Sequence, residues 1–341
     1  MAFFFFLTFS FLAGAAEPDN FSARHSPNTV VANADINRVV NSVLSLATDQ
    51  FQARNRCDRE KFLQFLEDDL DRNFPKVDNY IYLNAPFAGP KSYEETPLNK
   101  FRGYGKVFFS PSVKLEVKGK SFFVGLDKMD HFFSHGYLYW QMAGKKGKLD
   151  KEKVQNALQV GIEQENGPWG LKSSGVKSYA DLAANYAGLS FWSQLLDGPS
   201  PMIVCENGRF VQKRSFDIAN YFSEAMDETI NCNSYATKEM LSAVEKMTAP
   251  WNMECPVKAK ACDELKKNYP ADVASKILHP RCLGTGDSQS EEASAKTTKD
   301  IIDMAGAAVS GGPQYLLFKM FGQNKKHQAQ PQGENAGGGQ R

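Results

Sequence analysis

The segment GLDKMDHFFSHGYLYW, residues 125–140, places four titratable side chains within five positions. They are Asp127, Lys128, Asp130 and His131, and an aromatic run follows them directly. Carboxylates beside an imidazole can orient a general base or bind a metal ion, and a neighbouring lysine can form an ion pair or act as an amine. The segment is therefore a candidate for acid and base catalysis, for metal binding, or for a buried polar network.

A helix beginning near Lys128 must position these groups. Positions four apart share a helix face, so Asp127 and His131 are expected one above the other, with Asp130 on a neighbouring strip. The rest of this helix is apolar and needs a packing partner. Its apolar face contains Phe132, Phe133, Gly136, Tyr137 and Trp140. The polar cluster is therefore predicted to mark one end of a buried helix.

A second polar set follows in SGVKSYADLAANYAGLSFW. Asp181 and Asn185 are four residues apart, and Gly188 lies on the same side, where a missing side chain would let another helix come close. One intervening helix joins this segment to the first, so the two can pack together. His131, Asp181 and Asn185 are then predicted to converge.

A third set lies in SFDIANYFSEAMDETINCNSY. Ser215 is a candidate N-cap for a helix over residues 216–229, which would place Asp227 and Glu228 near its C-terminal end. Carboxylates there oppose the helix dipole by about 0.3–1 kcal/mol each. A compensating cation is therefore expected, and His131, Lys128 or a metal ion could supply it.

The first two motifs together resemble a known family. Asp127-Lys128-x-x-His131-Phe132, followed by Ser178-x-x-Asp181-x-x-Ala184-Asn185-x-x-Gly188, is similar to the paired motif of VanZ-like bacterial envelope proteins and related exported proteins. The similarity covers roughly residues 120 to 195. It implies a place in the bacterial envelope but no reaction. VanZ-like proteins carry these motifs on membrane-spanning helices, whereas charged residues interrupt every long apolar run of this chain.

Structural explanations compete with the functional ones. Asp127, just before a helix, is a preferred N-cap, and Asp181 lies in a pattern typical of a capping box. A histidine on an aromatic helix is often a hydrogen-bonded core residue, which would explain His131. Lys128 could be the ion-pair partner of either aspartate. Asn185 would similarly be a buried amide that ties two helices together.

Composition restricts the possible partners and compartment. The chain has 341 residues and a net charge of +1, without a basic face, so a nucleic-acid partner is not expected. Residues 1–16 form an apolar run that ends in small residues, which predicts a signal peptide. No later segment offers ~20 uncharged apolar residues. We therefore expect an exported protein of the periplasm or outer envelope of a bacterium, not membrane-spanning after signal removal.

Six cysteines fit this compartment. An even number in an exported chain favours disulfides, with the C-terminal half more densely cross-linked. Structural zinc is the rival interpretation, but Cys255 and Cys262 are spaced more widely than in a zinc knuckle. The candidates are Cys57, Cys205, Cys232, Cys255, Cys262 and Cys282.

Hydrophobic periodicity predicts a mainly α fold, a helical bundle with a small antiparallel β unit near residues 79–124. Lys118-Gly119 is expected to form a tight hairpin turn. One disulfide-stapled domain would span residues 17–285, followed over 286–341 by a linker, a short amphipathic segment and a disordered tail. The expected helices cover 35–51, 58–70, 128–143, 151–164, 179–196, 216–229, 237–246 and 262–267.

Two hypotheses follow. The favoured one is a non-catalytic envelope protein whose polar cluster fixes helix packing and supports ligand binding, with an envelope protein, glycan or lipid as partner. The alternative is a metal-assisted or acid/base hydrolase. It would use His131 as base or ligand, Asp127 and Asp181 as carboxylates, and Lys128, with a divalent metal as the candidate cofactor. Contacts to a ligand would come from Asn185, Gly188, Asp130, Tyr137, Asp227 and Glu228.

Overall fold

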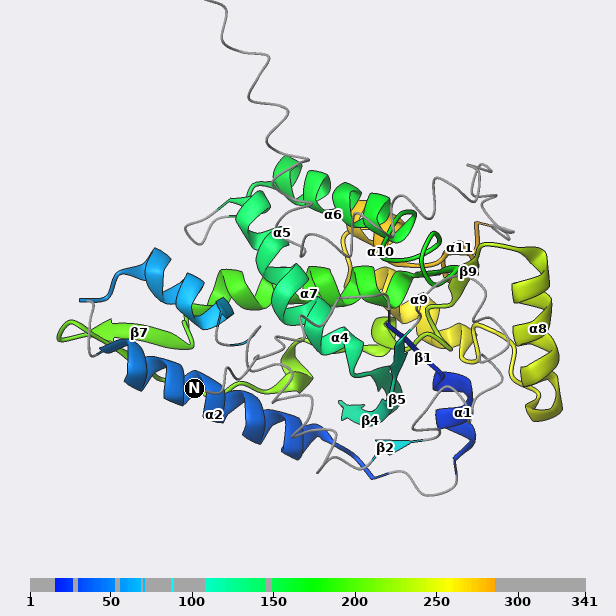
Figure 1. Ribbon diagram of the computed structural model, residues 1–341, viewed down its shortest axis with the longest axis horizontal. Coiled ribbons are helices and arrows are strands. Elements are labelled where there is room, and N and C mark those ends of the chain that lie inside the picture. Colours follow the sequence, from blue (N-terminus) through cyan, green and yellow to red (C-terminus); the bar gives the residue numbers. More distant parts are fainter. Residues whose placement is uncertain are drawn as a thin grey trace, which may run out of the picture. The chain divides into compact units, whose positions relative to one another are not determined.

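A computed structural model describes the chain over 16–26, 30–52, 56–68, 70, 87–88, 108–144 and 149–285 (Figure 1). The predicted signal peptide lies outside these residues except for Ala16. The predicted linker, amphipathic segment and tail over 286–341 also lie outside, as does most of 79–107.

Helices dominate the described residues, as the periodicity predicted. An unlabelled helix covers residues 59–68. The labelled helices are α1 (Asn20–His25), α2 (Asn33–Gln52), α4 (Asp127–Asp130), η3 (His131–His135), α5 (Gly136–Ala143), α6 (Lys151–Glu165), α7 (Tyr179–Leu195), η4 (Ile218–Asn220), η5 (Glu224–Met226), α8 (Lys238–Thr248), η6 (Ala249–Trp251), α9 (Ala259–Asn268), α10 (Ala271–Ile277) and α11 (Pro280–Leu283).

Short strands form four small sheets. The strands are β1 (Ala16–Pro18), β2 (Phe87–Ala88), β3 (Phe108–Ser110), β4 (Ser112–Val117), β5 (Lys120–Gly125), β6 (Val176–Ser178), β7 (Ile203–Glu206), β8 (Arg209–Gln212) and β9 (Asn233–Tyr235). Pairs β6–β9 and β7–β8 and the sheet β2–β4–β5 are antiparallel, whereas β1 and β3 pair in parallel. The β structure is thus more dispersed than a single antiparallel unit.

The hairpin between β4 and β5 forms at the predicted turn. Val117 pairs with Lys120 across it. Lys118 and Gly119 both have positive φ, 52° and 75°, as a type I′ turn requires. The next hairpin, β7–β8, turns at Asn207-Gly208 in the same way, with φ values of 50° and 77°. The strands β7 and β8 were not predicted, although Asn-Gly is a strong hairpin signal.

The predicted helix 216–229 was wrong. This segment instead contains two short 3-10 turns, η4 and η5, capped by Asp217 and Ser223. Its apolar residues follow a helical spacing because they reach the core from an irregular backbone. Phe216 and Phe222, for example, both lie within 6.1 Å of the Phe132 ring centroid.

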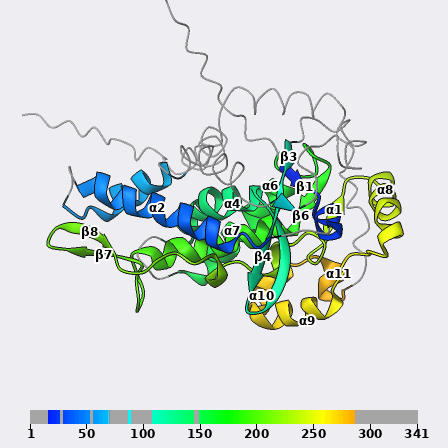
Figure 2. The same cartoon turned by 90° about the horizontal axis from the view of Figure 1, so that it is seen from below.

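Helix α7 lies at the centre of the packing. Most of its residues are buried, as expected for a helix that is apolar on all sides. It packs against α5 and η3 on one side and η5 on another, and Figure 1 shows α5 crossing it. Figure 2 shows α2 and the β7–β8 hairpin at one end of the described region and α8 at the other.

Three disulfides connect the six candidate cysteines. They are Cys57–Cys205, Cys232–Cys255 and Cys262–Cys282. Two of the three lie in the C-terminal half, as predicted, and such bonds are compatible with an exported protein. Among the described residues, no helix is both long enough and apolar enough to cross a membrane.

Candidate functional site

The polar cluster forms where strand β5 passes into helix α4. The N-cap of α4 is Leu126, and its side chain makes no capping hydrogen bond. Ser110 of β3 takes this role from a neighbouring strand. Its Oγ donates to Asp127 Oδ1 at 2.6 Å and accepts from the Asp127 N–H at 2.9 Å. Asp127 is therefore the first residue of the helix and not its cap.

Lys128 is completely buried, with its ammonium group among three carboxylates. Nζ lies 2.6 Å from Asp127 Oδ2, 2.6 Å from Asp181 Oδ1 and 2.7 Å from Glu228 Oε1. These contacts use all three N–H donors of the ammonium. Burial disfavours the charged form, but the surrounding carboxylates outweigh it and hold the pKa of Lys128 well above its ordinary value. Lys128 is thus an ion-pair partner of both aspartates and not a free amine.

His131, the first residue of η3, contacts α7 through both ring nitrogens. Nε2 lies 3.0 Å from Asp181 Oδ2, and Nδ1 lies 2.9 Å from the side-chain amide of Asn185. The structure therefore brings these three residues together, as their spacing predicted. Burial disfavours the imidazolium, but Asp181 and, more weakly, Glu165 outweigh it and raise the pKa of His131 to about 10.

The side-chain amide of Asn185 can form a hydrogen bond with His131 Nδ1 whether the imidazole is charged or neutral. Toward an imidazolium, Oδ1 accepts from Nδ1–H, and Nδ2 donates to the Tyr139 hydroxyl at 3.2 Å. Toward a neutral ring, the reversed amide donates to Nδ1 and reaches the backbone carbonyls of Asp181 and His131, each at 3.2 Å. The two carbonyls favour the reversed amide, whereas the nearby carboxylates favour the imidazolium. The Asp181 carboxylate, 3.0 Å from Nε2, decides between the two arrangements, because it favours the charged ring.

Asp181 lies at the centre of the network. Oδ1 contacts Lys128, Oδ2 contacts His131, and Ser178 Oγ is 2.9 Å from Oδ1. Burial opposes its ionisation, but His131 and Lys128 outweigh burial and hold the pKa of Asp181 well below its ordinary value. Ser178 caps α7, and its Oγ accepts from the Asp181 N–H. The reciprocal half of the capping box comes from elsewhere, because the Ser178 N–H donates to Glu165 Oε2 at 3.1 Å.

Buried carboxylates outnumber buried cations in this region. Glu17 and Glu165 are 4% and 2% exposed, and burial raises the pKa of both carboxyls well above the ordinary value. Asp181 raises both pKa values further, and Glu228 also raises that of Glu17. Burial also raises the pKa of Asp127 and of Glu228. These acids therefore bind protons more tightly than ordinary carboxylates do.

Asp227 and Glu228 were predicted as neighbours at a helix end, but they have separate partners. Asp227 is fully buried and forms an ion pair with Arg24. It also accepts from the backbone N–H of Phe123 at 2.8 Å and of Thr229 at 2.9 Å. Glu228, 5% exposed, joins the Lys128 cluster. The predicted place near the C-terminal end of a helix is therefore wrong for both, and Lys128 is the compensating cation for Glu228.

The remaining candidate residues either pack between helices or lie away from the Lys128 cluster. Gly188 meets Gly136 where α7 crosses the helix of His131, so its role is close packing. Tyr137 lies away from the cluster, with its ring 4.8 Å from that of Trp192. Asp130 is partly exposed.

Residues that the sequence did not identify complete the site. His135 lies one turn beyond His131, with ring centroids 4.7 Å apart, within the π-helical turn η3. The His-x-x-x-His spacing was a signal for this pair. Glu17, Glu165 and Arg24 come from distant segments, and no local pattern marks them. The π turn lets the ring of His135 reach Trp169, at 5.6 Å.

Asp127, His131 and Asp181 offer ligand atoms within 4.8 Å of one another, as a metal site requires. The same atoms already accept or donate hydrogen bonds inside the protein. Asp127 Oδ2 and Asp181 Oδ1 hold the Lys128 ammonium, and Asp181 Oδ2 holds the His131 ring. The ammonium thus occupies the position between the carboxylates that a cation would take. A metal ion could bind here by displacing Lys128 and the proton on His131.

Comparisons with models of protein families, with curated proteins and with solved structures found no match to this chain. The resemblance to VanZ-like proteins therefore stays a prediction.

Proposed function

We propose that this chain is an exported, non-catalytic protein of the bacterial envelope that binds a ligand and uses its Lys128 cluster to fix helix packing. One observation carries the proposal. Both nitrogens of His131 and all three N–H donors of Lys128 are directed at internal partners. A general base must present a nitrogen to the substrate, and a catalytic amine must lose its proton. Neither condition suits these side chains.

The network instead suits a role in specifying the fold. Lys128 of α4 contacts Asp181 of α7 and Glu228 between η5 and β9, so one nitrogen joins three distant segments. A buried ion pair adds little net stability but penalises any register that leaves a charge unpaired. The cluster therefore selects the arrangement in which α4, α7 and the 224–235 segment meet.

The envelope setting is part of the same proposal. Three disulfides support export, because such bonds persist in oxidising compartments. The paired motif that resembles VanZ-like proteins supports a place in the periplasm or outer envelope. An envelope protein, a glycan or a lipid is the macromolecular partner that this setting favours.

A second candidate is the metal-assisted or acid/base hydrolase that uses His131, Asp127 and Asp181. The grouping of their ligand atoms within 4.8 Å favours it, as does the 12% exposure of the His131 side chain. A π-helical turn beside the site is also frequent at functional sites. This function requires Lys128 to leave the carboxylates.

His131→Ala distinguishes the two functions. In the packing role, the variant strands Asp181 and Asn185 and lowers the free energy of unfolding by about 1–3 kcal/mol. The measurement is chemical denaturation at pH 7, with the exposed His25→Ala as the matched histidine control. In the hydrolase role, His131→Ala would unfold like the wild type but lose Zn²⁺ or Mn²⁺ binding by calorimetry. That result would overturn the proposal.

A further inference from the structure

A cavity of about 450 Å³ lies between α8, β9, the start of α1 and residues 252–255. Its volume falls in the usual range for small-molecule sites. Figures 1 and 2 both show α8 beside α1. The apolar part of the wall includes Phe21, Leu241, Val244 and Met253. The cavity therefore offers an apolar surface for the body of a small ligand.

This cavity borders the Lys128 cluster, and Glu228 belongs to both. Glu228 lines the cavity, and its Oε1 accepts from Lys128 at 2.7 Å and is 3.0 Å from Ser178 Oγ. Its other oxygen, Oε2, accepts from Asn233 Nδ2 at 2.7 Å. A carboxylate has about four acceptor positions, so Glu228 Oε2 can accept a further hydrogen bond.

A second cavity of about 30 Å³ adjoins the first, and both are lined by Glu228, Asn233 and Tyr235. Glu17 also lines the smaller one and is 4% exposed. Within the described parts of the chain, Glu17 Oε2 and Asn233 Oδ1 are buried without a hydrogen-bond partner. A space of this size holds one water-sized group. When Glu17 is ionised, both atoms are acceptors, so the group that fills the space must be a hydrogen-bond donor.

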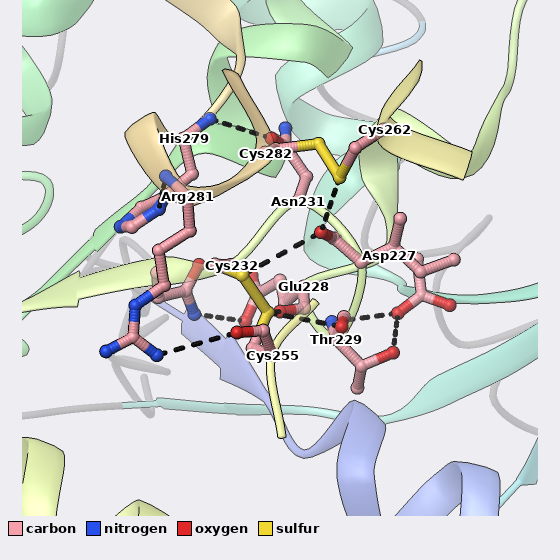
Figure 3. The surroundings of a disulfide bond; sticks show 12 residues. Asp227, Glu228, Thr229, Asn231, Cys232, Cys255, Cys262, His279, Arg281 and Cys282 are labelled. Atoms are coloured by element: carbon pink, nitrogen blue, oxygen red, sulfur yellow. Dashed lines mark hydrogen bonds between the residues drawn. A yellow bond between two sulfur atoms is a disulfide. The ribbon is translucent and has the colours of Figure 1, made fainter. Parts of the chain in front are cut away.

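The charges of the larger cavity select a cation. Its lining contains three carboxylates, Glu228, Glu245 and Glu254, and one guanidinium, Arg281. Arg281 is already engaged, because it donates to the Cys255 carbonyl at 3.5 Å beside the Cys232–Cys255 bond (Figure 3) and lies 3.7 Å from Glu245. The lining therefore attracts positive charge.

We propose that the two cavities together bind a small molecule with a primary ammonium group, which inserts between Glu17, Glu228 and Asn233 while its apolar body lies along α8. Lys128 provides the physical precedent, because on the opposite side of Glu228 an ammonium satisfies three carboxylates at 2.6–2.7 Å. A quaternary ammonium does not fit this role, since it has no N–H donors. The inference rests on the proposed binding function and names its ligand class.

Glu17 supplies an independent readout. Burial raises its pKa well above the ordinary value, with further contributions from Glu228 and Asp181, which Lys128 and Ser174 oppose. Glu17 therefore binds its proton more tightly than an ordinary carboxylate does. An ammonium beside it favours the carboxylate, so binding should release a proton into the buffer.

The test is isothermal titration of the full chain with hexylamine at pH 7.5, in two buffers of different ionisation enthalpy. We expect saturable binding of one equivalent, with proton release, and at least tenfold weaker binding of hexanol and of hexyltrimethylammonium. Glu17→Gln should weaken hexylamine binding at least tenfold and abolish the proton release. Leu241→Trp should block the cavity from a partly exposed position of α8. Leu46→Trp, at a position 51% exposed on α2, is the matched control and should bind like the wild type.

Equal affinity for hexylamine and hexanol would overturn the inference, because the ammonium would then make no contact of its own. Hexylamine binding that both Glu17→Gln and Leu241→Trp leave unchanged would place the amine elsewhere and also overturn it. These failures differ from a failure of the proposed function. If hexylamine does not bind while His131→Ala still destabilises the fold, the packing role stands and the ammonium site alone is wrong.

Discussion

Gly188 of α7 lies against Gly136 at the point where the two helices cross. A Cβ atom at Gly136 would lie 2.5 Å from Gly188 Cα, and one at Gly188 would lie 1.8 Å from the Phe132 carbonyl oxygen. Both distances are far inside van der Waals contact, and the opposing atoms belong to backbone that cannot rotate away. The helices can therefore come this close, and bring His131 next to Asp181, only because neither glycine has a side chain.

Gly188→Ala should consequently be strongly destabilising. Overpacking typically costs about 1–3 kcal/mol, and we expect the upper part of this range because the clash is with backbone. Denaturant titration measures the loss. Ser190→Ala, at a partly exposed position on the same helix, is the control and should change stability by less than about 0.5 kcal/mol. An unchanged midpoint for Gly188→Ala would mean that the helices can separate without cost.

Lys128→Met tests the charge balance of the cluster. The variant leaves Asp127, Asp181 and Glu228 without their shared cation, and removal of one partner from a buried pair costs about 3–5 kcal/mol. Because the pKa values of Asp127 and Glu228 are already raised, these acids take up protons readily. The loss should therefore be smaller at pH 5 than at pH 8. Equal losses at both pH values would argue against the carboxylates as its cause.

His131 should make stability depend on pH on the alkaline side. Its pKa rises from 6.5 in the unfolded chain to about 10 in the fold, so its contribution is complete below pH 6.5 and is lost as the pH rises through about 10. The difference in unfolding free energy between wild type and His131→Gln should shrink across this interval. Titration of the ring nitrogens by ¹⁵N NMR gives the pKa directly. An ordinary value near 6.5 would mean that Asn185 holds the neutral ring by its Nδ2 group.

Local pattern predicted those parts of the structure that local interactions determine. Helix α2 follows from its apolar stripe, and the Lys118-Gly119 turn follows from a glycine that tolerates positive φ. The convergence of His131 with Asp181 followed from four-residue spacing and a single intervening helix. In contrast, the spacing of Phe216 and Phe222 mimicked a helix, although the residues pack into the core from 3-10 turns. Spacing reports which side chains are buried and not which backbone carries them.

The long-range contacts of the cluster could be predicted only in part. Lys128 was one of three candidate cations for Glu228, which lies 100 residues away, and the bond from Ser178 to Glu165 was not predicted. Such contacts depend on the tertiary arrangement, and an isolated glutamate has no sequence signal that separates a buried acid from a solvated one. Asp227 shows the same limit, since its partner Arg24 lies 203 residues away.

His135 contrasts with Lys128, because one of its ring nitrogens, Nδ1, is buried without a hydrogen-bond partner in the described structure. Burial together with His131 lowers the pKa of His135 to about 4. A lowered histidine pKa means that stability is present above pH 6.5 and is lost as the pH falls toward 4. His135→Phe removes the unsatisfied nitrogen and keeps a ring against Trp169, so it should add about 1 kcal/mol at pH 7 and more at pH 4.5. His279→Phe is the matched control and should destabilise, because His279 is 2% exposed and its Nδ1 accepts from the Arg281 N–H at 3.0 Å. A less stable His135→Phe would mean that the imidazole at 135 contributes a contact that phenylalanine cannot replace.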